Sequence, residues 1–181
     1  LRCIPNMVIC TPSDENETRK LLTTAYLHNG PASVRYPRGT GPNSNVDKDL
    51  KPLKIGEANI INEESSEIVI LNFGTLLNEA NQISKELKAT LVDMRFVKPL
   101  DEKLLRKLFK KAKVFISIED GSIMGGAGSA VQEFASKENL NVRSILFGIP
   151  DKFIEHASRE EMLVEAGLDV ENIKAKLSKL L

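Results

Sequence analysis

Short apolar runs alternate with amphipathic stretches through the last two-thirds of the chain, and this alternation restricts its fold more than any other feature. Residues 68–73 (IVILNF) form a near-continuous apolar run, as expected of a strand buried on both faces. Other strands are expected at residues 90–93, 114–118 and 142–147, with an edge strand at 55–61. Helices are expected between them at residues 76–87, 101–111, 128–137 and 158–167, and after Asp169. The alternation predicts an α/β domain over residues 55–181, with a mostly parallel sheet between helical layers.

Residues 1–40 carry a shorter pattern of the same kind. A strand is expected at residues 7–10, then a capping-box-like helix start at residues 11–14 with Pro12 at the first helical position, and a second strand at 32–36. One β–α–β unit cannot cover both faces of its own parallel strands, so we expect residues 1–40 to be the end of a larger domain. Residues 41–54, rich in Pro, Gly, Asn and charged side chains, are expected to form a linker.

Arg38 is the candidate ligand-binding residue. It follows the expected strand at residues 32–36, which Pro31 and Pro37 bracket. If that strand is parallel, Arg38 lies just outside its carboxyl end, the edge where ligands bind in open α/β sheets. A guanidinium there offers a planar, permanently charged fork for a phosphate or a carboxylate. The alternative interpretation is a surface arginine near a turn, since most arginines are exposed.

The composition argues against several classes of protein. The 25 basic and 25 acidic residues leave no net field that favours nucleic acid or an anionic membrane. Cys3 and Cys10 lack the spacing of a zinc site or a disulfide framework, so we expect two buried free thiols. The sequence shows no apolar run of the roughly 18 residues that a membrane helix needs, and no signal-peptide pattern. These features argue against a nucleic-acid or membrane partner and favour a reducing, cytoplasmic compartment.

The stretch Gly125-Gly126-Ala127-Gly128 lies where a loop leads into a helix. Backbone N–H groups at such a helix start can bind a phosphate. However, the stretch is not a full G-x-G-x-x-G motif, and it lacks the Lys-Ser/Thr pair of a P-loop. We favour the interpretation that its glycines let the helix pack closely against the sheet or a neighbouring chain.

Other polar groups are weaker candidates. Glu119 and Asp120 follow a strand, but no converging ligand can be identified, so we expect helix capping or loop hydrogen bonds rather than a metal site. His156 has no spaced partner and is expected to be structural or exposed. The basic face of the helix at residues 101–111 is expected to be a solvated surface, since it lacks aromatic residues on which bases could stack. Its members are Lys103, Arg106, Lys107, Lys110 and Lys111.

Four stretches carry a resemblance to a known family: LRCIPNM (residues 1–7), TPSDENE (11–17), VRYPRG (34–39) and IMGGAG (123–128). Over its whole length the chain resembles the carboxyl-terminal part of the 1-deoxy-D-xylulose-5-phosphate synthases, thiamine-diphosphate enzymes related to transketolase. The stretches DMR (93–95) and PLD (99–101) look like a pattern shared with other transketolase-like relatives, including the β subunits of 2-oxo acid dehydrogenases. The resemblance implies a transketolase C-terminal-like three-layer domain at residues 55–181, preceded by the tail of the pyrimidine-binding domain at residues 1–40.

The resemblance also implies a function. It implies a homodimeric transferase that joins pyruvate to D-glyceraldehyde 3-phosphate, with loss of CO2, in the synthesis of isoprenoid and thiamine precursors. Thiamine diphosphate and Mg²⁺ would be held by earlier domains, so no catalytic, cofactor-binding or metal-binding residue can be assigned here. The fragment alone is expected to be inactive and to bind neither group. Arg38 of the Tyr-Pro-Arg-Gly motif would be the ligand of the triose phosphate.

Two alternatives remain open at this stage. One is the β subunit of a thiamine-dependent 2-oxo acid dehydrogenase, from which the motif at residues 36–39 distinguishes this chain. The other is a non-catalytic domain that dimerises through the glycine-rich loop and binds no small molecule. Leu1 counts against this second alternative, because a free-standing protein is expected to begin with Met and to complete its first sheet.

Overall fold

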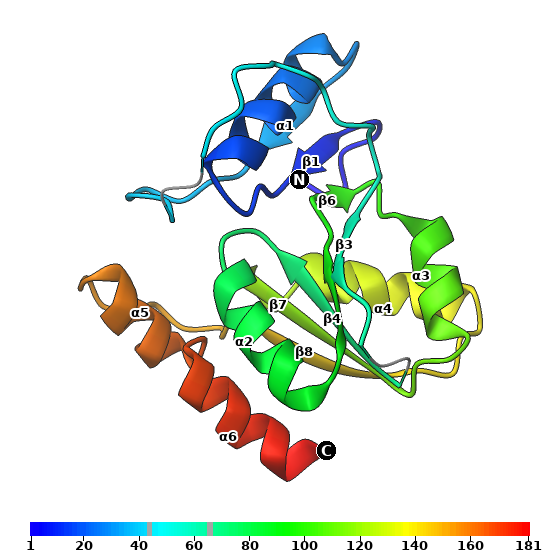
Figure 1. Ribbon diagram of the computed structural model, residues 1–181, viewed down its shortest axis with the longest axis vertical. Coiled ribbons are helices and arrows are strands. Elements are labelled where there is room, and N and C mark those ends of the chain that lie inside the picture. The colour runs from blue at the N-terminus through cyan, green and yellow to red at the C-terminus, as the bar shows by residue number, and fades with distance from the viewer. Residues whose placement is uncertain (43–44, 65–66) are drawn as a thin grey trace.

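The computed structural model describes residues 1–42, 45–64 and 67–181 (Figure 1). Its larger sheet has the strand order β3-β5-β4-β7-β8. Strands β5, β4, β7 and β8 run parallel, and the edge strand β3 is antiparallel to β5. The expected α/β fold with a mostly parallel sheet is therefore confirmed. The strand bounds are β3 (Asn59–Asn62), β4 (Ile68–Phe73), β5 (Thr90–Asp93), β7 (Val114–Ser122) and β8 (Arg143–Ile149).

Helices cover both faces of this sheet, with α2 and α4 on opposite sides (Figure 1). Strand β4 shows why its apolar run is continuous. Val69, Leu71 and Phe73 belong to the core cluster that includes α3 and α4, whereas Ile70 belongs to the cluster that includes α2 and α6. Successive side chains of a strand point to opposite faces, so burial on both faces favours apolar residues at successive positions. The polar residue of β4, the buried Asn72, donates from its side chain to the Gly74 carbonyl at 2.8 Å. The helix bounds are α2 (Leu77–Leu87), α3 (Glu102–Phe109), α4 (Ala127–Lys137) and α6 (Val170–Leu180).

Helix caps account for three of the helix starts expected from the sequence. Asp101 caps α3 by accepting a hydrogen bond from the backbone N–H of Leu104, and Asp169 caps α6 in the same way. Helix α5 (Arg159–Ala166) begins with the expected capping box between Ser158 and Glu161, and it ends at Gly167. These starts depend on interactions within four residues, which is why the sequence shows them.

The smaller sheet has the order β2-β1-β6 and combines two strands that precede the linker with one that follows it. Strands β1 (Val8–Cys10) and β2 (Ala32–Val34) are parallel and joined by α1 (Glu15–Leu27), as expected. Strand β6 (Phe96–Lys98) was not expected, and it pairs antiparallel with β1. Its buried Phe96 packs beside β1 in a small core cluster. A three-residue strand has too little periodicity to be recognised in a sequence.

The start of α1 differs from the expectation. Asp14 is the N-cap, accepting a hydrogen bond from the N–H of Glu17 at 2.7 Å, and the helix begins at Glu15. Pro12 therefore precedes the helix instead of occupying its first position. Ser13 is not a cap, because its hydroxyl donates to the Asp93 carboxylate at 2.7 Å. The Ser13 side chain thus contacts strand β5 of the larger sheet and makes no capping hydrogen bond within α1.

The described linker residues lie along α1 and form no helix or strand within residues 41–42 and 45–54; residues 43–44 lie outside the described ranges. Asp47 forms an ion pair with Lys20 at 2.8 Å, and the N–H of Leu53 donates to the Thr24 hydroxyl at 2.7 Å.

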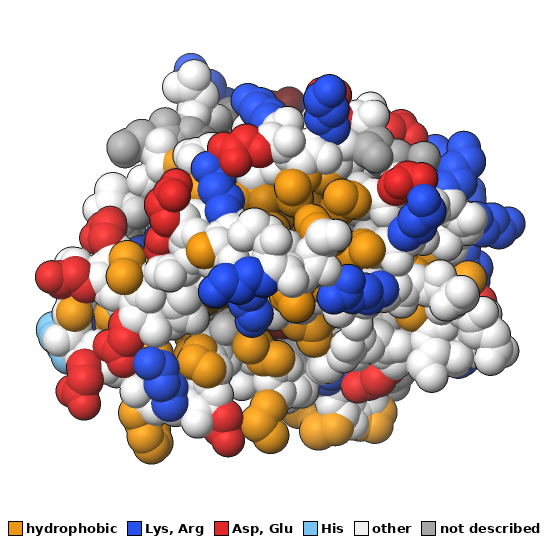
Figure 2. All heavy atoms as spheres, turned by 90° about the horizontal axis from the view of Figure 1, so that it is seen from below, with side chains coloured by type: hydrophobic (Ala, Val, Ile, Leu, Met, Phe, Trp, Pro, Cys, Tyr) orange, Lys and Arg blue, Asp and Glu red, His pale blue; other side chains and the backbone are white. Residues whose placement is uncertain are grey.

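Figure 2 views the molecule from below and shows basic and acidic side chains interspersed with apolar groups over the face seen from that side. That face shows no extended area of one charge.

Candidate functional site

Arg38 lies beyond the carboxyl end of a parallel strand, which is the placement that the sequence suggested. Strand β2 ends at Val34, four residues earlier, and pairs parallel with β1. Arg38 is exposed and makes no hydrogen bond or ion pair with any residue in the described ranges. Its guanidinium is therefore free to bind an anion at the edge where α/β sheets bind ligands.

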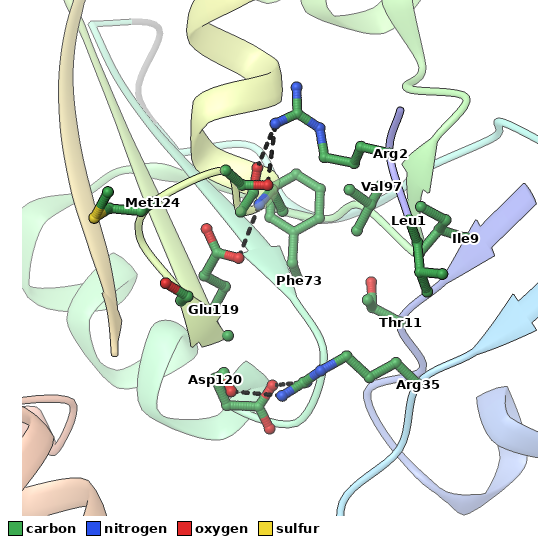
Figure 3. Close-up of a pocket in the computed structure, with 15 residues that line it drawn as sticks. Leu1, Arg2, Ile9, Thr11, Arg35, Phe73, Val97, Glu119, Asp120 and Met124 are labelled. Carbon is green, nitrogen blue, oxygen red and sulfur yellow. Dashed lines mark hydrogen bonds and ion pairs between the residues drawn. The ribbon is translucent and has the colours of Figure 1, made fainter. Parts of the chain in front are cut away.

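Arg35, three residues earlier, is held in a different way. Its guanidinium forms an ion pair with the Asp120 carboxylate and also donates to the Asp120 backbone carbonyl at 2.6 Å. Figure 3 shows Arg35 pointing from the first sheet toward Asp120 on β7. Asp120 also accepts a hydrogen bond from the Thr75 hydroxyl at 2.9 Å. Glu119 and Asp120 were expected to follow the strand, but β7 extends to Ser122 and includes both. The hydrogen bond from Thr75, in the connection between β4 and α2, agrees with the expected loop hydrogen bond, and the pair with Arg35 joins the two parts of the chain.

A cleft of about 330 Å³ lies beside Arg38. Arg35, Arg38 and Asp120 line it together with Arg159, the first residue of α5. Its remaining wall is apolar, built from Pro37, Ile149, Ile154, Met162, Leu163, Ala166 and Leu168. The volume lies at the lower end of the range typical of small-molecule sites. The sequence did not single out Arg159, because nothing in the sequence indicates that it lies near Arg38.

The glycine-rich loop does not offer a free anion site. The Glu119 carboxylate accepts hydrogen bonds from the N–H groups of Ala127 at 2.8 Å and Gly128 at 2.9 Å, at the start of α4. An internal carboxylate thus occupies the position that a phosphate would take. Burial of Glu119 raises the pKa of its carboxyl group, although the two N–H donors act in the opposite direction.

Close packing explains Gly126 and Gly128, as the sequence analysis favoured, whereas Gly125 has open space around it and a positive φ of 68° that glycine adopts without strain. A Cβ atom at Gly126 would lie 2.1 Å from the Ser122 carbonyl oxygen, and one at Gly128 would lie 2.2 Å from the Ser117 hydroxyl. Arg2 lies over the loop and donates to the carbonyls of Gly125 and Gly126 at 3.1 and 3.2 Å (Figure 3). The loop therefore fastens the N-terminal segment to α4.

A buried polar network also joins the two parts of the chain. Asp93 is 2% exposed and accepts the Ser13 hydrogen bond from the other side of the junction. Burial raises the pKa of Asp93 to about 7, with nearby Glu17 adding to the rise and the Ser13 hydrogen bond opposing it. Arg95 completes the junction by pairing bidentately with Glu17 at 2.7 and 2.8 Å. The sequence analysis missed this network, whose members come from separate segments.

The other candidates remain apart from the cleft. His156 is exposed in the connection between β8 and α5. Cys10 is buried and free, but Cys3 is free and exposed, so the expectation of two buried thiols was wrong for Cys3. The short N-terminal turn that carries Cys3 lies outside the core clusters, which explains its exposure. Arg106 on the basic face of α3 is not merely solvated, because it pairs with Glu102 and Glu138.

The described residues contain neither a metal-binding cluster nor a membrane-spanning helix. In the ranges 1–42, 45–64 and 67–181, no group of three or more His, Cys, Asp or Glu residues is placed to hold a metal ion. Across the same residues, no helix is both long and apolar enough to span a membrane.

Comparison with known proteins defines the class first. A model of the transketolase C-terminal domain matches residues 56–173, and a model of the transketolase pyrimidine-binding domain matches residues 1–43. The chain belongs to the transketolase C-terminal domain family. A split-gene transketolase, solved as an inactive beta4 tetramer, has a TM-score of 0.86 at 27% identity and covers 98% of this chain and 59% of its own. Transketolase from Campylobacter jejuni, with a TM-score of 0.68 at 18% identity over 98% of this chain and 27% of its own, supports the fold alone.

Curated relatives give a narrower result. The 1-deoxy-D-xylulose-5-phosphate synthase of Pseudomonas fluorescens strain Pf0-1 is 50% identical over 181 residues, the whole of this chain. The synthase of Pseudomonas aeruginosa strain LESB58 is 52% identical over 174 residues, 96% of this chain. In both cases the chain spans 28% of the relative's length.

Proposed function

We propose that the full-length protein is a 1-deoxy-D-xylulose-5-phosphate synthase. It would condense pyruvate with D-glyceraldehyde 3-phosphate, with loss of CO2, for isoprenoid and thiamine precursor synthesis. Identity of about half over the whole chain to synthases of that name supports the proposal. The single structural observation that carries it is the guanidinium of Arg38, which has no partner among residues 1–42, 45–64 and 67–181 and follows the carboxyl end of a parallel strand of the first sheet, the edge where ligands bind in α/β sheets.

Arg38 makes no bond to the reacting carbon atoms in this proposal. It binds the phosphate of the triose and so orients the aldehyde toward the carbon that attacks it. Holding one reactant in place lowers the entropic part of the barrier. A guanidinium suits this task, because it stays charged and can donate two parallel hydrogen bonds to a phosphate.

We further propose that thiamine diphosphate and Mg²⁺, whose bound form supplies the carbanion chemistry, are held by residues outside this chain. The described residues do not fit either group. They offer no cluster of metal ligands, and Glu119 already occupies the N–H groups at the start of α4. The 181-residue chain by itself is therefore proposed to bind neither group and to have no synthase activity.

The C-terminal domain contributes packing and dimer contacts in this proposal, and the full-length enzyme is a cytoplasmic homodimer. Its sheet anchors the segment that carries Arg38 through the Arg35–Asp120 pair and the Ser13–Asp93 hydrogen bond. Both contacts lie between the two parts of the chain, so the C-terminal domain fixes the position of the segment that carries Arg38.

The test is the Arg38→Ala substitution in the full-length enzyme. Loss of a charge-assisted hydrogen bond costs about 1.5 to 3 kcal/mol, so kcat/KM for the phosphorylated triose should fall roughly 10- to 150-fold. The KM for pyruvate should change little, because pyruvate carries no phosphate. Arg19→Ala, at an exposed position on α1, is the matched control. Equal losses for both substrates would show that Arg38 does not bind the phosphate.

A further inference from the structure

Arg159 lies in the same cleft as Arg38, although 120 residues separate them along the chain. Arg38 follows strand β2 of the first sheet, and Arg159 is the first residue of helix α5, which follows β8 of the larger sheet. The cleft thus brings together guanidinium groups from both parts of the molecule.

Most of the hydrogen-bonding capacity of these two groups is unused. A guanidinium has about five N–H donors. In the described ranges, Arg159 uses one of them, to donate to the Thr75 hydroxyl at 2.8 Å, and Arg38 uses none. Arg159 is only partly exposed, and its one contact is to a neutral group. Both guanidinium groups can therefore receive an anion without first breaking an ion pair.

Asp120 is the one acidic residue among the side chains that line the cleft, and it is already engaged. Its carboxylate pairs with Arg35 and accepts the Thr75 hydrogen bond at 2.9 Å. Because Thr75 also accepts from Arg159, a continuous chain of contacts runs from Arg35 through Asp120 and Thr75 to Arg159. This chain holds Arg159 in place while leaving its positive charge, and that of Arg38, unbalanced.

The apolar wall strengthens the effect of these charges. Met162 and Leu163 of α5 and Ile149 at the end of β8 form part of it. Apolar groups displace water, and a lower local dielectric makes a charge-assisted hydrogen bond stronger. An anion bound there gains more from two guanidinium groups than it would on an open surface.

We propose that Arg159 is a second ligand of the phosphate carried by the acceptor substrate and shares that phosphate with Arg38. A phosphate ester carries a charge of about −1.5 to −2 near neutral pH, which matches two uncompensated guanidinium groups. This inference rests on the proposed function, because it takes the phosphorylated triose to be the ligand of the cleft.

The experiment uses the full-length enzyme with Arg159→Gln, Arg159→Lys and the control Arg19→Gln. Two acceptors are compared: D-glyceraldehyde 3-phosphate and D-glyceraldehyde, which lacks the phosphate. Arg159→Gln should raise the KM for the phosphorylated acceptor and the inhibition constant of inorganic phosphate roughly 10-fold. Values for D-glyceraldehyde and pyruvate should stay within about two-fold, and Arg159→Lys should recover part of the loss, as a point charge without the planar fork.

Folding can be separated from binding in this design. The capping box between Ser158 and Glu161 does not use the Arg159 side chain, so α5 should survive both substitutions. Circular dichroism checks this. In the double variant Arg38→Ala/Arg159→Gln, kcat/KM for D-glyceraldehyde 3-phosphate should fall by less than the product of the two single fold-losses, because both residues contact one phosphate.

The inference is overturned if Arg159→Gln changes neither the KM for D-glyceraldehyde 3-phosphate nor the inhibition by phosphate. It is also overturned if the substitution raises the KM equally for D-glyceraldehyde 3-phosphate and for D-glyceraldehyde. If Arg38→Ala discriminates between the two acceptors and Arg159→Gln does not, Arg159 is excluded while the proposed function stands. If neither variant discriminates, the proposed function fails as well.

Discussion

Asp93 provides a direct test of how the two parts of the chain are joined. Asp93 is 2% exposed, and the pKa of its carboxyl group is raised from an ordinary value of 3.8 to about 7, chiefly by burial. A shift of about 3 units corresponds to about 4 kcal/mol, which is the cost of keeping this charge buried in the folded chain. Asp93→Asn keeps the shape and an oxygen that can accept the Ser13 hydrogen bond, and it removes the charge.

The sign of the pH dependence follows from the two pKa values. Between about pH 4 and pH 7 the folded chain retains the Asp93 proton while the unfolded chain loses it. The free energy of unfolding of the wild-type chain therefore falls as the pH rises through this window, as far as this group is concerned. Asp93→Asn should be similar to the wild type near pH 4, and more stable by up to about 4 kcal/mol at pH 8.

The assay is urea unfolding of the 181-residue chain, with and without the substitution, at pH values across this window. The difference in unfolding free energy between the variants isolates Asp93 from the other carboxyl groups. Asp151→Asn, at an exposed position after β8, is the matched control. A difference that does not change with pH would refute the reasoning, as would a wild type that becomes the more stable form at high pH.

Two further predictions concern the N-terminal segment and helix α4. Glu119→Gln should destabilise the chain by about 1 to 3 kcal/mol in urea unfolding, because an amide can accept only one of the two hydrogen bonds from Ala127 and Gly128. The control is Glu155→Gln, at an exposed position between β8 and α5, and equal stability of the two variants would contradict the cap. Cys3 should react rapidly with a thiol reagent such as Ellman's, because it is exposed. Cys10 should react only after unfolding, because burial raises the pKa of its thiol to about 12. Rapid reaction of two thiols per folded chain would contradict the buried position of Cys10.

Local patterns in the sequence predicted the larger sheet well. Residues 68–73 and 90–93 are strands with the expected bounds. Burial on both faces makes the run at residues 68–73 almost continuously apolar, which is why the sequence shows it so clearly. Asp101, Ser158 and Asp169 cap the helices that they were expected to cap. Each of these features depends on neighbours within a few positions, so one sequence contains the information.

The contacts that build the site depend on distant residues, and the sequence could not supply them. Ser13 is of a residue type that often caps helices, but its hydroxyl donates a hydrogen bond to Asp93, 80 residues away. The chain of contacts from Arg35 to Arg159 spans four separate segments, and Glu119 caps a helix that begins eight residues later. The placement of Arg38 could be predicted, because it needs only the direction of one strand. Its neighbours in the cleft required the three-dimensional structure.

Strand β6 has a consequence for how this protein can be divided. It follows the linker in sequence, yet it is hydrogen-bonded to β1, which precedes the linker. The pyrimidine-domain segment at residues 1–43 and the C-terminal domain at residues 56–173 are therefore not structurally independent units. Cutting the chain between them would expose strand edges on both products, and grafting one piece onto a relative would require the matching edge to be carried with it. In the split-gene transketolase, one chain matches 98% of this one, so the counterparts of both pieces lie together on that chain.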